Sequence, residues 1–424
     1  MTSPYCQTVI QHLVSNYERM YHEPTGRFRH PYIVPGAGYE HCLWDWDSFF
    51  ASRAILAIMR LSGATDELRA KMLGAMRGCI LNFLDFQLPS GAMPYSVYLG
   101  AEDHFQEAVA NHDEPNQHKP VMAQFADLLA HQPGDRQWLR ECMPKFDRFL
   151  AHYEEAYLDA RTGLYRWRSD AVIGVDNDPC TFGRPRNSSA SVYLNCLMVK
   201  ELDAMARLHR ACGNGRDAAE RYVAKRERLS AAIRQWCWDR RDRFFYSVDL
   251  QCRTDHTLPY LNHGLGVFWP CIPLRMQVWT GFMPMWAGVA TAEQAADLVR
   301  LHLHNREGLA CDYGIRSLAA NEPMYNCDET GNPSNWLGPV WLIVNYIVFK
   351  GLLNYGFRVE AEELCRQTVD LLGRDIERFG GMHEYYVPES GIGVMNCGFM
   401  NWNYLVAEML DAVGWLAPRQ TPTA

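Results

Sequence analysis

The feature that most constrains the fold is a long series of helical segments of two kinds. Residues 48–61 and 341–353 are apolar on nearly every face, whereas residues 359–379 carry apolar side chains on one face only. A helix that is apolar all round must be buried, and a helix with one apolar face lies at a surface. The alternation of the two kinds along the chain therefore predicts two concentric layers of helices.

Capping and turn residues separate these segments. Residues 194–208 place leucine or methionine at every third or fourth position and stop before Gly213. Thr291 and Gln294 have the spacing of a capping box ahead of residues 295–302. A last helix is expected at about residues 402–413.

Strand signals are weak and local. Residues 164–167 and 244–248 alternate well enough to predict short β-hairpins, and no βαβ rhythm is present. At about 35 residues for a helix with its loop, 424 residues give about twelve helices. The expected fold is all-α, an (α/α)6 toroid with short β-hairpin insertions, formed as a single domain from residues 1–424 with its site in the mouth.

Charge and composition narrow the classes of partner. The net charge of -8 disfavours nucleic acid and anionic membranes, and no apolar stretch approaches the roughly 18 residues of a membrane span. The 14 cysteines form no CxxC pair, which makes structural zinc unexpected. Unpaired thiols and an N-terminus without a signal-peptide pattern predict a cytoplasmic protein.

Two carboxyl groups stand out because they lie on loops among turn residues and aromatics. Asp176 lies in residues 174–179, and Glu384 lies in residues 382–391. Two such carboxyls, in a chain with 13 tryptophans and 21 tyrosines, fit glycoside hydrolysis. In that reaction one carboxyl protonates the leaving oxygen, and the other activates water or attacks the sugar.

Simpler readings exist for both acids. Asp176 stands before Asn177 in a sequence that favours an Asx-turn, and Glu384 alone reads as a surface acid. Glu389 is a rival of Glu384, but its neighbours Pro388 and Ser390 indicate an exposed turn. The aromatic neighbours of Glu384 favour partial burial.

Aromatic and acidic residues near the N-terminus form the next candidate group. Tyr39 ends a glycine-rich loop, and a short motif of two tryptophans and two aspartates follows it, namely Trp44, Asp45, Trp46 and Asp47. Aromatic faces pack on the apolar side of a pyranose, and carboxylates bond its hydroxyls. Helix capping by Asp47 is the simpler explanation, but it accounts for only one of the aspartates.

Further candidates lie on loops marked by proline and glycine. Tyr95 and Gln117 are possible ligands of sugar hydroxyls, although ordinary turn chemistry explains them equally well. Trp336, Gly338 and Trp341 lie where a loop enters an apolar helix, and the five-residue spacing of the tryptophans predicts that one faces the pore while the other packs. The polar segment 101–117 reads as a rim loop or lid.

Several other kinds of site are absent from the sequence. There is no HExxH, GxSxG or Walker motif. The 15 histidines lack zinc-ligand spacing. We therefore expect no metal and no cofactor.

Taken in order, the motifs resemble those of glycoside hydrolase family 63, in particular its small bacterial mannosylglycerate and glucosylglycerate hydrolases. The similar segments span nearly the whole chain, and they are residues 26–32, 43–50, 174–179, 281–290, 336–341 and 384–391. The resemblance implies an (α/α)6 barrel, an inverting mechanism and no obligatory cofactor. It also implies that Asp176 is the general acid and Glu384 the general base.

The resemblance further implies which residues surround the departing sugar, namely Trp44, Asp47, Gln117, Trp336 and Trp341. A glycerate leaving group carries a carboxylate, which needs a cation or several donors. The candidate cations are Lys119, Arg184, Arg186 and Arg316. Arg184 and Arg186 are equally explained by pairing with local acids.

The sequence therefore predicts an inverting α-glycosidase that acts on a small α-glucoside or α-mannoside such as glucosylglycerate or mannosylglycerate, with its carboxyls about 6.5–9.5 Å apart. Its only expected partner is a small-molecule sugar. A trehalase-like or oligosaccharide α-glucosidase is the enzymatic alternative. A sugar epimerase or isomerase on the same barrel, and a non-catalytic sugar-binding protein, are alternatives of other classes. No motif distinguishes glucose from mannose or fixes the oligomeric state.

Overall fold

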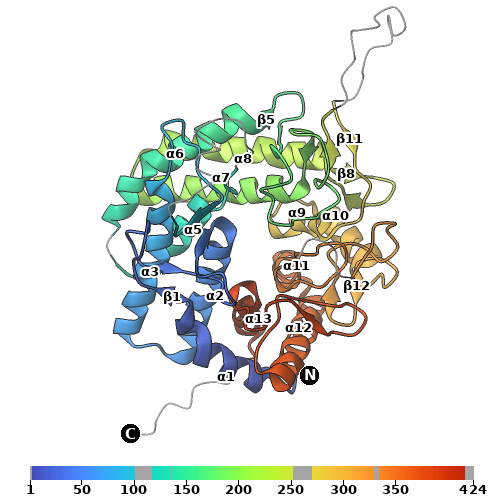
Figure 1. The fold of residues 1–424 in the computed structure, drawn as a ribbon. Helices are drawn as coiled ribbons and strands as arrows, with labels where there is room; N and C mark the ends of the chain where they lie inside the picture. Colours follow the sequence, from blue (N-terminus) through green and yellow to red (C-terminus); the bar gives the residue numbers. More distant parts are fainter. Residues whose placement is uncertain (1, 101–116, 135, 252–269, 329–333, 416–424) are drawn as a thin grey trace, which may run out of the picture.

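The helices are arranged as a ring that closes where the N-terminal helices meet the C-terminal ones (Figure 1). The computed structural model describes residues 2–100, 117–134, 136–251, 270–328 and 334–415. The predicted rim loop 101–117 lies outside the described residues except for Gln117. The described chain is mostly helical, as the sequence predicts.

An inner layer of helices forms the wall around the centre of the ring. Its members are α2 (Asp45–Ser62), α5 (Met122–Ala130), α7 (Val192–Cys212), α9 (Met283–Trp286), α11 (Leu342–Asn354) and α13 (Val406–Val413). Each packs against the next, and α13 packs against α2, so the inner layer is closed. Because these helices contact neighbours on most faces, they are apolar nearly all round.

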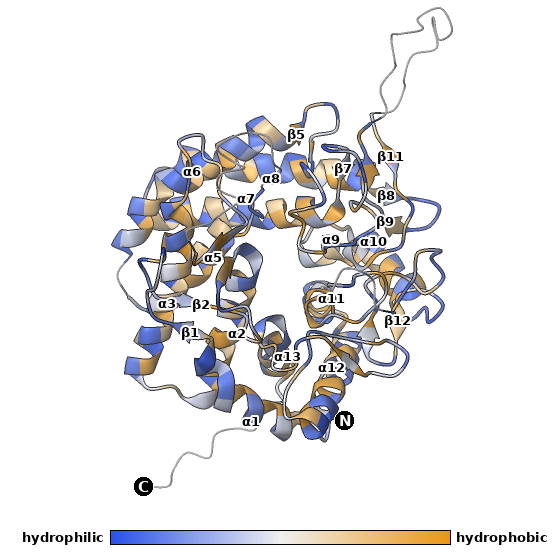
Figure 2. Ribbon diagram, in the orientation of Figure 1, coloured by the Kyte–Doolittle hydropathy of each residue, from blue (hydrophilic) through white to orange (hydrophobic). Residues whose placement is uncertain are grey.

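An outer layer covers this wall. It consists of α1 (Cys6–Asn16), α3 (Asp66–Asp85), α6 (Gln137–Tyr157), α8 (Arg216–Trp236), α10 (Ala292–Leu298) and α12 (Arg358–Phe379). Hydrophilic residues gather on the outward faces of these helices (Figure 2), which is the amphipathic pattern expected of surface helices. Both predicted kinds of helix are therefore present in alternation along the chain.

The remaining regular elements are short. The 3-10 turns are Tyr17–Met20, Trp279–Phe282 and Asn401–Leu405, and Val299–Leu303 is a π-helical turn. The paired strands are β1 (Tyr21–His22) with β2 (Tyr32–Ile33), β3 (Cys42–Trp44) with β4 (Ser96–Tyr98), β5 (Leu158–Asp159) with β6 (Leu164–Tyr165), β8 (Trp238–Asp239) with β9 (Phe244–Phe245), β12 (Ala310–Cys311) with β13 (Gly314–Ile315), and β14 (Tyr385–Tyr386) with β15 (Gly393–Val394). Strand β10 (Val248–Asp249) pairs with both β7 (Ser189–Ala190) and β11 (Ile272–Pro273).

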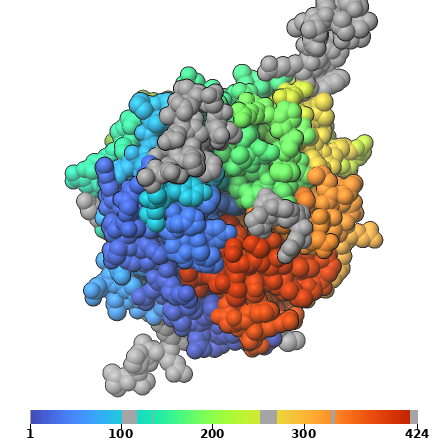
Figure 3. All heavy atoms as spheres, in the orientation of Figure 1, coloured from blue at the N-terminus to red at the C-terminus, as the bar shows by residue number. Residues whose placement is uncertain are grey.

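Several local predictions are confirmed. The capping box of Thr291 and Gln294 starts α10, and Gly213 ends α7 in the left-handed conformation with φ of 73°. The first two residues of each predicted strand segment, 164–165 and 244–245, lie in short hairpins. Figure 3 shows the N-terminal and C-terminal parts of the chain side by side on one face, which is how the ring closes.

One predicted boundary is wrong. Helix α2 begins at Asp45, three residues before the predicted start, with Trp44 at its N-cap position. The early start follows from β3, whose last residue Trp44 pairs with Ser96 and delivers the chain directly into the helix. Asp45 and Asp47 therefore both lie in the first turn, where the helix dipole favours negative charge, and Asp47 is not the cap.

Within the described residues, no helix is both long and apolar enough to cross a membrane. No disulfide joins the cysteines of the same residues.

Candidate active site

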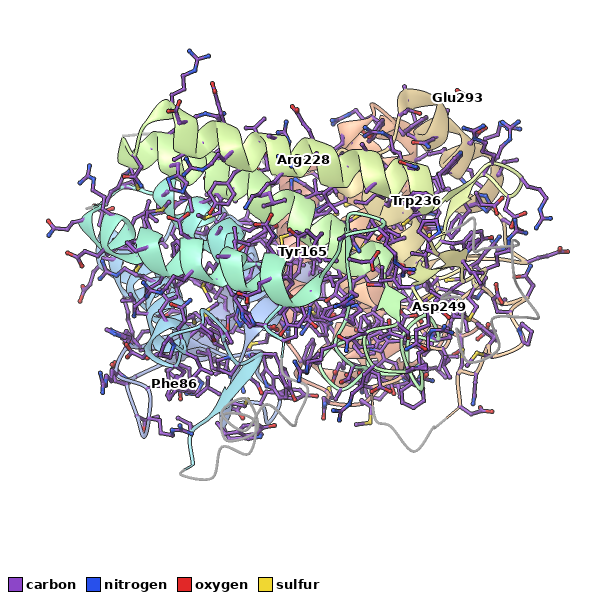
Figure 4. All side chains as sticks on the ribbon, turned by 90° about the horizontal axis from the view of Figure 1, so that it is seen from above. Phe86, Tyr165, Arg228, Trp236, Asp249 and Glu293 are labelled. Carbon is purple, nitrogen blue, oxygen red and sulfur yellow. The ribbon has the colours of Figure 1, made fainter. Side chains whose placement is uncertain are left out.

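The candidate residues lie on segments that lead into the inner helices. Asp45 and Asp47 begin α2, Lys119 precedes α5, and the loops that carry Asp176 and Glu384 precede α7 and α13. Because the inner helices stand side by side in a ring, their preceding loops meet at one end of it. In the side view of Figure 4, irregular segments gather along one edge of the molecule, away from α8.

Glu384 is buried and held by two donors. It immediately precedes β14, and its Oε2 accepts hydrogen bonds from Tyr39 Oη at 3.1 Å and Asn396 Nδ2 at 2.5 Å. Burial raises the pKa of Glu384, and the charge of Asp176 raises it too, whereas the bonds from Asn396 and Tyr39 act in the opposite direction. The carboxyl is therefore removed from water, and protein donors replace water at one of its oxygens.

Asn396 was not among the residues that the sequence predicted. Met395 and Asn396 have positive φ angles of 59° and 36°, a conformation that residues other than glycine seldom adopt. Strained backbone of this kind concentrates at functional sites. In this conformation the Asn396 amide donates to both Tyr39 and Glu384, and no sequence signal predicts it.

Asp176 lies half-buried on the loop before α7. Burial raises the pKa of Asp176, and this outweighs a hydrogen bond from Ser334 and the charge of Lys119, which both lower it. The Asx-turn considered for Asp176 belongs instead to Asp178, whose Oδ1 accepts from the backbone N–H of Cys180 at 2.9 Å. The side chain of Asp176 is thus free of the turn that carries it.

Asn177 attaches this loop to the loop before α11. Its Nδ2 donates to Asn335 Oδ1 at 3.1 Å, and its Oδ1 accepts from the backbone N–H of Trp336 at 2.6 Å. Asp176 is thereby brought to Ser334 and to the tryptophans that follow. The two predicted carboxyls act on each other, because the charge of Asp176 contributes to the raised pKa of Glu384.

Asp45 and Lys119 form a fully buried ion pair. Lys119 Nζ lies 3.0 Å from Asp45 Oδ1, and the backbone N–H of Lys119 donates to Asp45 Oδ2 at 2.7 Å. A Cβ on Gly174 would lie 2.9 Å from Lys119 Cε, so a glycine is required where the Asp176 loop passes this lysine. Lys119 thus contributes positive charge beside Asp176 from within an ion pair.

Asp47 is buried beside these groups. Burial raises its pKa to about 8, with further increases from the charges of Asp45 and Glu384 and an opposing effect of Lys119. Asn401 Nδ2 donates to Asp47 Oδ1 at 2.5 Å. Asn401, which lies in the 3-10 turn before α13, is a second residue that sequence analysis missed.

Tryptophans line the interior next to the carboxyls. Trp336 and Trp341 stack on each other with ring centroids 4.1 Å apart and planes within 4°. Both rings are buried and face each other, so which of the two faces the pore stays a prediction. Trp46 lies 6.3 Å from Trp336 and 5.3 Å from Trp402 between centroids, so Trp402 joins the group.

Trp44 and Tyr95 lie together at the start of α2. Their ring centroids are 6.0 Å apart, and the backbone carbonyl of Tyr95 accepts from the N–H of Asp45 at 3.0 Å.

Gly338 lies at a position where a side chain would not fit. Its φ is 141°, and a Cβ there would lie 2.5 Å from the Tyr325 ring.

Gln117 has its side-chain amide engaged within the protein. Its Nε2 donates to Tyr153 Oη and to the carbonyl of Arg166, both at 3.2 Å. Its Oε1 accepts from the backbone N–H of Arg168 at 2.9 Å. The contacts of Gln117 therefore fix the backbone at residues 166–168.

The four predicted cations do not form one cluster. Arg184 pairs with Asp249, which is labelled in Figure 4, and Arg186 lies exposed nearby on the same loop. Arg316 is buried and donates to several backbone carbonyls, including that of Ala310. With Lys119 committed to Asp45, the contacts of three of the four are internal to the protein.

Glu389 occupies the exposed turn that its neighbours predict. Its Oε1 accepts from Tyr325 Oη at 2.5 Å and lies 3.6 Å from Arg316 Nη2. It is more than half exposed, unlike Glu384. Of the two rival acids, only Glu384 is enclosed together with Asp176.

Asp375, near the end of α12, forms hydrogen bonds with residues on both sides of Glu384. Its Oδ2 accepts from the backbone N–H of His383 at 2.8 Å and from Tyr386 Oη at 2.9 Å, and its Oδ1 lies 2.9 Å from His383 Nδ1. Nothing in the sequence singles out Asp375, which looks like any other acid on an amphipathic helix. Its bonds fix residues on both sides of Glu384.

The described residues contain no group of three or more histidine, cysteine, aspartate or glutamate side chains arranged to hold a metal ion.

Residues 39–402 match the protein family described as the mannosylglycerate hydrolase MGH1-like glycoside hydrolase domain. The chain belongs to this MGH1-like glycoside hydrolase family. The matched range includes both carboxyls and most of the aromatic residues described above, so these residues lie within a glycoside hydrolase domain.

Two mannosylglycerate hydrolases are similar to this chain in sequence. The mannosylglycerate hydrolase MGH1 of Selaginella moellendorffii is 35% identical over 122 residues, which cover 29% of this chain and 22% of that protein. The mannosylglycerate hydrolase of Thermus thermophilus is 24% identical over 89% of this chain and 96% of its own length. The chain thus spans about a fifth of the plant relative but nearly all of the bacterial one.

A solved structure shares the fold. The family 63 mannosylglycerate hydrolase from Thermus thermophilus, determined in complex with Tris and D-glycerate, superposes with a TM-score of 0.68 at 21% identity. The superposition covers 95% of this chain and all of that one. The similarity shows that the helical ring is the fold of that enzyme.

Proposed function

We propose that this chain is an inverting α-glycosidase that hydrolyses mannosylglycerate or glucosylglycerate. Membership of the MGH1-like family supports hydrolysis of a glycoside, and the activity named for the Thermus relative supports mannosylglycerate. The observation that carries the proposal is the enclosure of Asp176 and Glu384, on loops from distant parts of the chain, within reach of each other's charge. A pair of carboxyls is what both inverting and retaining hydrolysis require.

In the proposed mechanism, Asp176 gives its proton to the glycosidic oxygen as the bond to the anomeric carbon breaks. Glu384 takes a proton from a water molecule, whose oxygen attacks that carbon from the opposite face of the ring. The products are a sugar of inverted configuration and a leaving group that carries a hydroxyl. Solvent then returns the two carboxyls to their starting protonation states.

The surroundings of the two carboxyls suit these different roles. Burial raises the pKa of Asp176 and so favours the protonated form that an acid needs. Tyr39 and Asn396 donate hydrogen bonds to Glu384 and so oppose the effect of burial on its pKa. These hydrogen bonds favour the ionised form that a base needs. Environments that separate the roles of two acids are a feature of such sites.

We further propose that the helical ring is an (α/α)6 barrel, with α2, α5, α7, α9, α11 and α13 inside and α1, α3, α6, α8, α10 and α12 outside. In this barrel the sugar lies against the tryptophans around Trp46 and Trp336. Asp47 and Asn401 bond its hydroxyls. Tyr39, Trp44, Asp45, Tyr95, Gln117, Gly338 and Trp341 shape the same site.

The leaving group is proposed to be glycerate, whose carboxylate needs a cation. Lys119, Arg184, Arg186 and Arg316 stay the candidates. Replacement of the responsible residue by alanine is expected to raise KM for a glycosylglycerate more than for the matching glycosylglycerol, since only the first carries the charge. If no substitution alters the ratio of the two KM values, the leaving group is neutral.

The direct test is incubation with mannosylglycerate, glucosylglycerate and trehalose, followed by proton NMR. Hydrolysis of a glycosylglycerate with the β-anomer of the sugar appearing first supports the proposal. Release of the α-anomer would show retention, cleavage of trehalose alone would favour a trehalase-like enzyme, and interconversion of free sugars would indicate an epimerase. Glu384→Gln should be inactive while Glu389→Gln remains active, and the reverse result would identify Glu389 as the base.

A further inference from the structure

A pocket opens in the wall of the ring between α7 and α8, next to the turn that follows α9. Its volume is about 360 Å³. The polar side chains that line it are Lys200, Asp203, Arg226, Glu227, Ser230 and Arg234. None of these residues belongs to the proposed active site, and α8 forms the outer surface here (Figure 4).

The acids of the pocket are already neutralised. Asp203 accepts from Arg226 at 2.8 Å and also pairs with Arg207. Arg226 lies 3.4 Å from Glu227 as well. The carboxylates that line the pocket are therefore paired with Arg207 and Arg226.

Two other cations of the pocket, Lys200 and Arg234, pair with no carboxylate of the described residues. Within the described residues, Lys200 Nζ makes no hydrogen bond and no ion pair, and it lies 5.4 Å from the centroid of the Trp286 ring. Arg234 Nη1 donates to the carbonyl of Val289 at 3.0 Å, and its guanidinium pairs with no carboxylate in the described part of the chain. Both side chains are half-buried.

The position of Lys200 is unfavourable for an unaccompanied charge. Burial lowers its pKa, and the neighbouring cations Arg53 and Arg207 lower it further, while Asp203 acts in the opposite direction. A desolvated cation without a partner is costly to the folded protein. An anion in the pocket would remove that cost.

We propose that this pocket binds a phosphate group, held by Lys200 and Arg234 with the hydroxyl of Ser230 as a further donor. A phosphate dianion matches two unpaired cations, and arginine forms directed bonds to its oxygens. The pocket volume lies within the range of small-molecule sites, so the group comes either as inorganic phosphate or as part of a small phosphate ester. The inference is independent of the proposed function.

The test is titration calorimetry of the full chain with inorganic phosphate and, separately, with glucose 6-phosphate, in buffers matched in ionic strength with KCl. Both probes are expected to bind. Lys200→Met keeps most of the length of the side chain but removes its charge, and it should weaken binding by about ten-fold or more. Arg234→Gln should do the same, whereas Arg228→Gln, on the exposed face of α8 (Figure 4), should bind like the parent protein.

Tighter binding of the ester would identify a phosphorylated metabolite as the source, and equal binding would identify inorganic phosphate. Absence of binding by the parent protein at millimolar concentrations would overturn the proposal. Unchanged binding in both Lys200→Met and Arg234→Gln would also overturn it. Arg234 lies on the outer helix α8, whereas Lys200 lies on the inner helix α7. Weaker binding in Arg234→Gln as well as in Lys200→Met therefore shows loss of the binding site and not damage to the inner wall.

Discussion

At the scale of single residues, the two carboxyls differ in what surrounds them rather than in their chemistry. Glu384 receives two directed hydrogen bonds on one oxygen, and Asp176 receives support from Ser334 and the charge of Lys119. Burial raises the pKa of both side chains. The residues that contact each carboxyl oppose or add to the effect of burial on its pKa, so substitutions there have directional effects.

Asp176→Asn is expected to lower kcat by about 10²–10⁴-fold, because the change is nearly isosteric but removes the proton that the leaving oxygen receives. A substrate with a good leaving group, such as a p-nitrophenyl glycoside, should lose much less. Steady-state kinetics on both substrates checks this expectation. Equal losses on the two would contradict the general-acid role.

Tyr39→Phe is expected to move the acidic limb of the pH profile of kcat/KM to higher pH. The hydroxyl of Tyr39 lowers the pKa of Glu384, so its removal lets that pKa rise, and the base then ionises only at higher pH. The profile should be compared with that of Tyr313→Phe, whose hydroxyl bonds Ser390 instead of Glu384. A shift common to both variants, or absent from both, argues against the assignment.

At the scale of elements, the short strand β14 is what holds Glu384 in register. Asp375 bonds the residue before Glu384 and the second residue after it. Tyr386 also exchanges backbone hydrogen bonds with Val340 at 2.8 and 3.0 Å. A two-residue strand is too short to fix its own geometry, so the outer helix α12 and the loop before α11 fix it.

Asp375→Asn is expected to reduce kcat by about ten- to a hundred-fold with little change in KM. The amide cannot accept all of the bonds from His383 and Tyr386, and small displacements of a reacting group are costly. The acidic limb of the pH profile should move as well, since Glu384 shifts relative to Tyr39 and Asn396. Glu377→Gln on the exposed face of the same helix turn is the control. An unchanged kcat in Asp375→Asn would show that β14 holds its position without α12.

At the scale of the whole molecule, an ionic cluster joins the first and last inner helices. Arg53 of α2 lies 2.7 Å from Glu408 of α13, and Lys350 of α11 lies 2.9 Å from the same carboxylate. Tyr346 donates to Glu408 at 2.7 Å. Residues more than three hundred positions apart are thereby connected where the ring closes.

Glu408→Gln is expected to lower the free energy of unfolding at pH 7 by about 3 kcal/mol, because it leaves the partly buried cations Arg53 and Lys350 beside a neutral group. Burial alone would raise the pKa of Glu408, but Arg53 and Lys350 bring it down to about 2. Its contribution is therefore complete above the unfolded value of about 4.3 and is lost as pH falls towards 2.

Urea unfolding at pH 7 and at acidic pH checks this expectation, and the difference between the parent and Glu408→Gln should shrink as the pH falls. Asp411 lies on α13, as Glu408 does, and forms an exposed ion pair with Arg60 of α2. Asp411→Asn removes this pair and should change stability by less than about 1 kcal/mol. A similar loss in both variants would mean that the cluster has no special role in ring closure.

The sequence by itself determined the helical content and the two kinds of helix, because burial on all faces or on one face leaves a direct record in side-chain polarity. Local signals also held where neighbours in sequence make the contact, as in the capping box at Thr291 and the glycine end of α7. The start of α2 was missed because Trp44 is fixed by β4, more than fifty residues away.

Only the tertiary structure decided which groups meet. Nothing local in the chain links Asn396 or Asp375 to Glu384, pairs Lys119 with Asp45, or stacks Trp336 on Trp341. These contacts arise because the loops before successive inner helices meet at one end of a closed ring. Composition and periodicity depend on neighbours a few residues away, whereas the arrangement of the site depends on how distant segments pack.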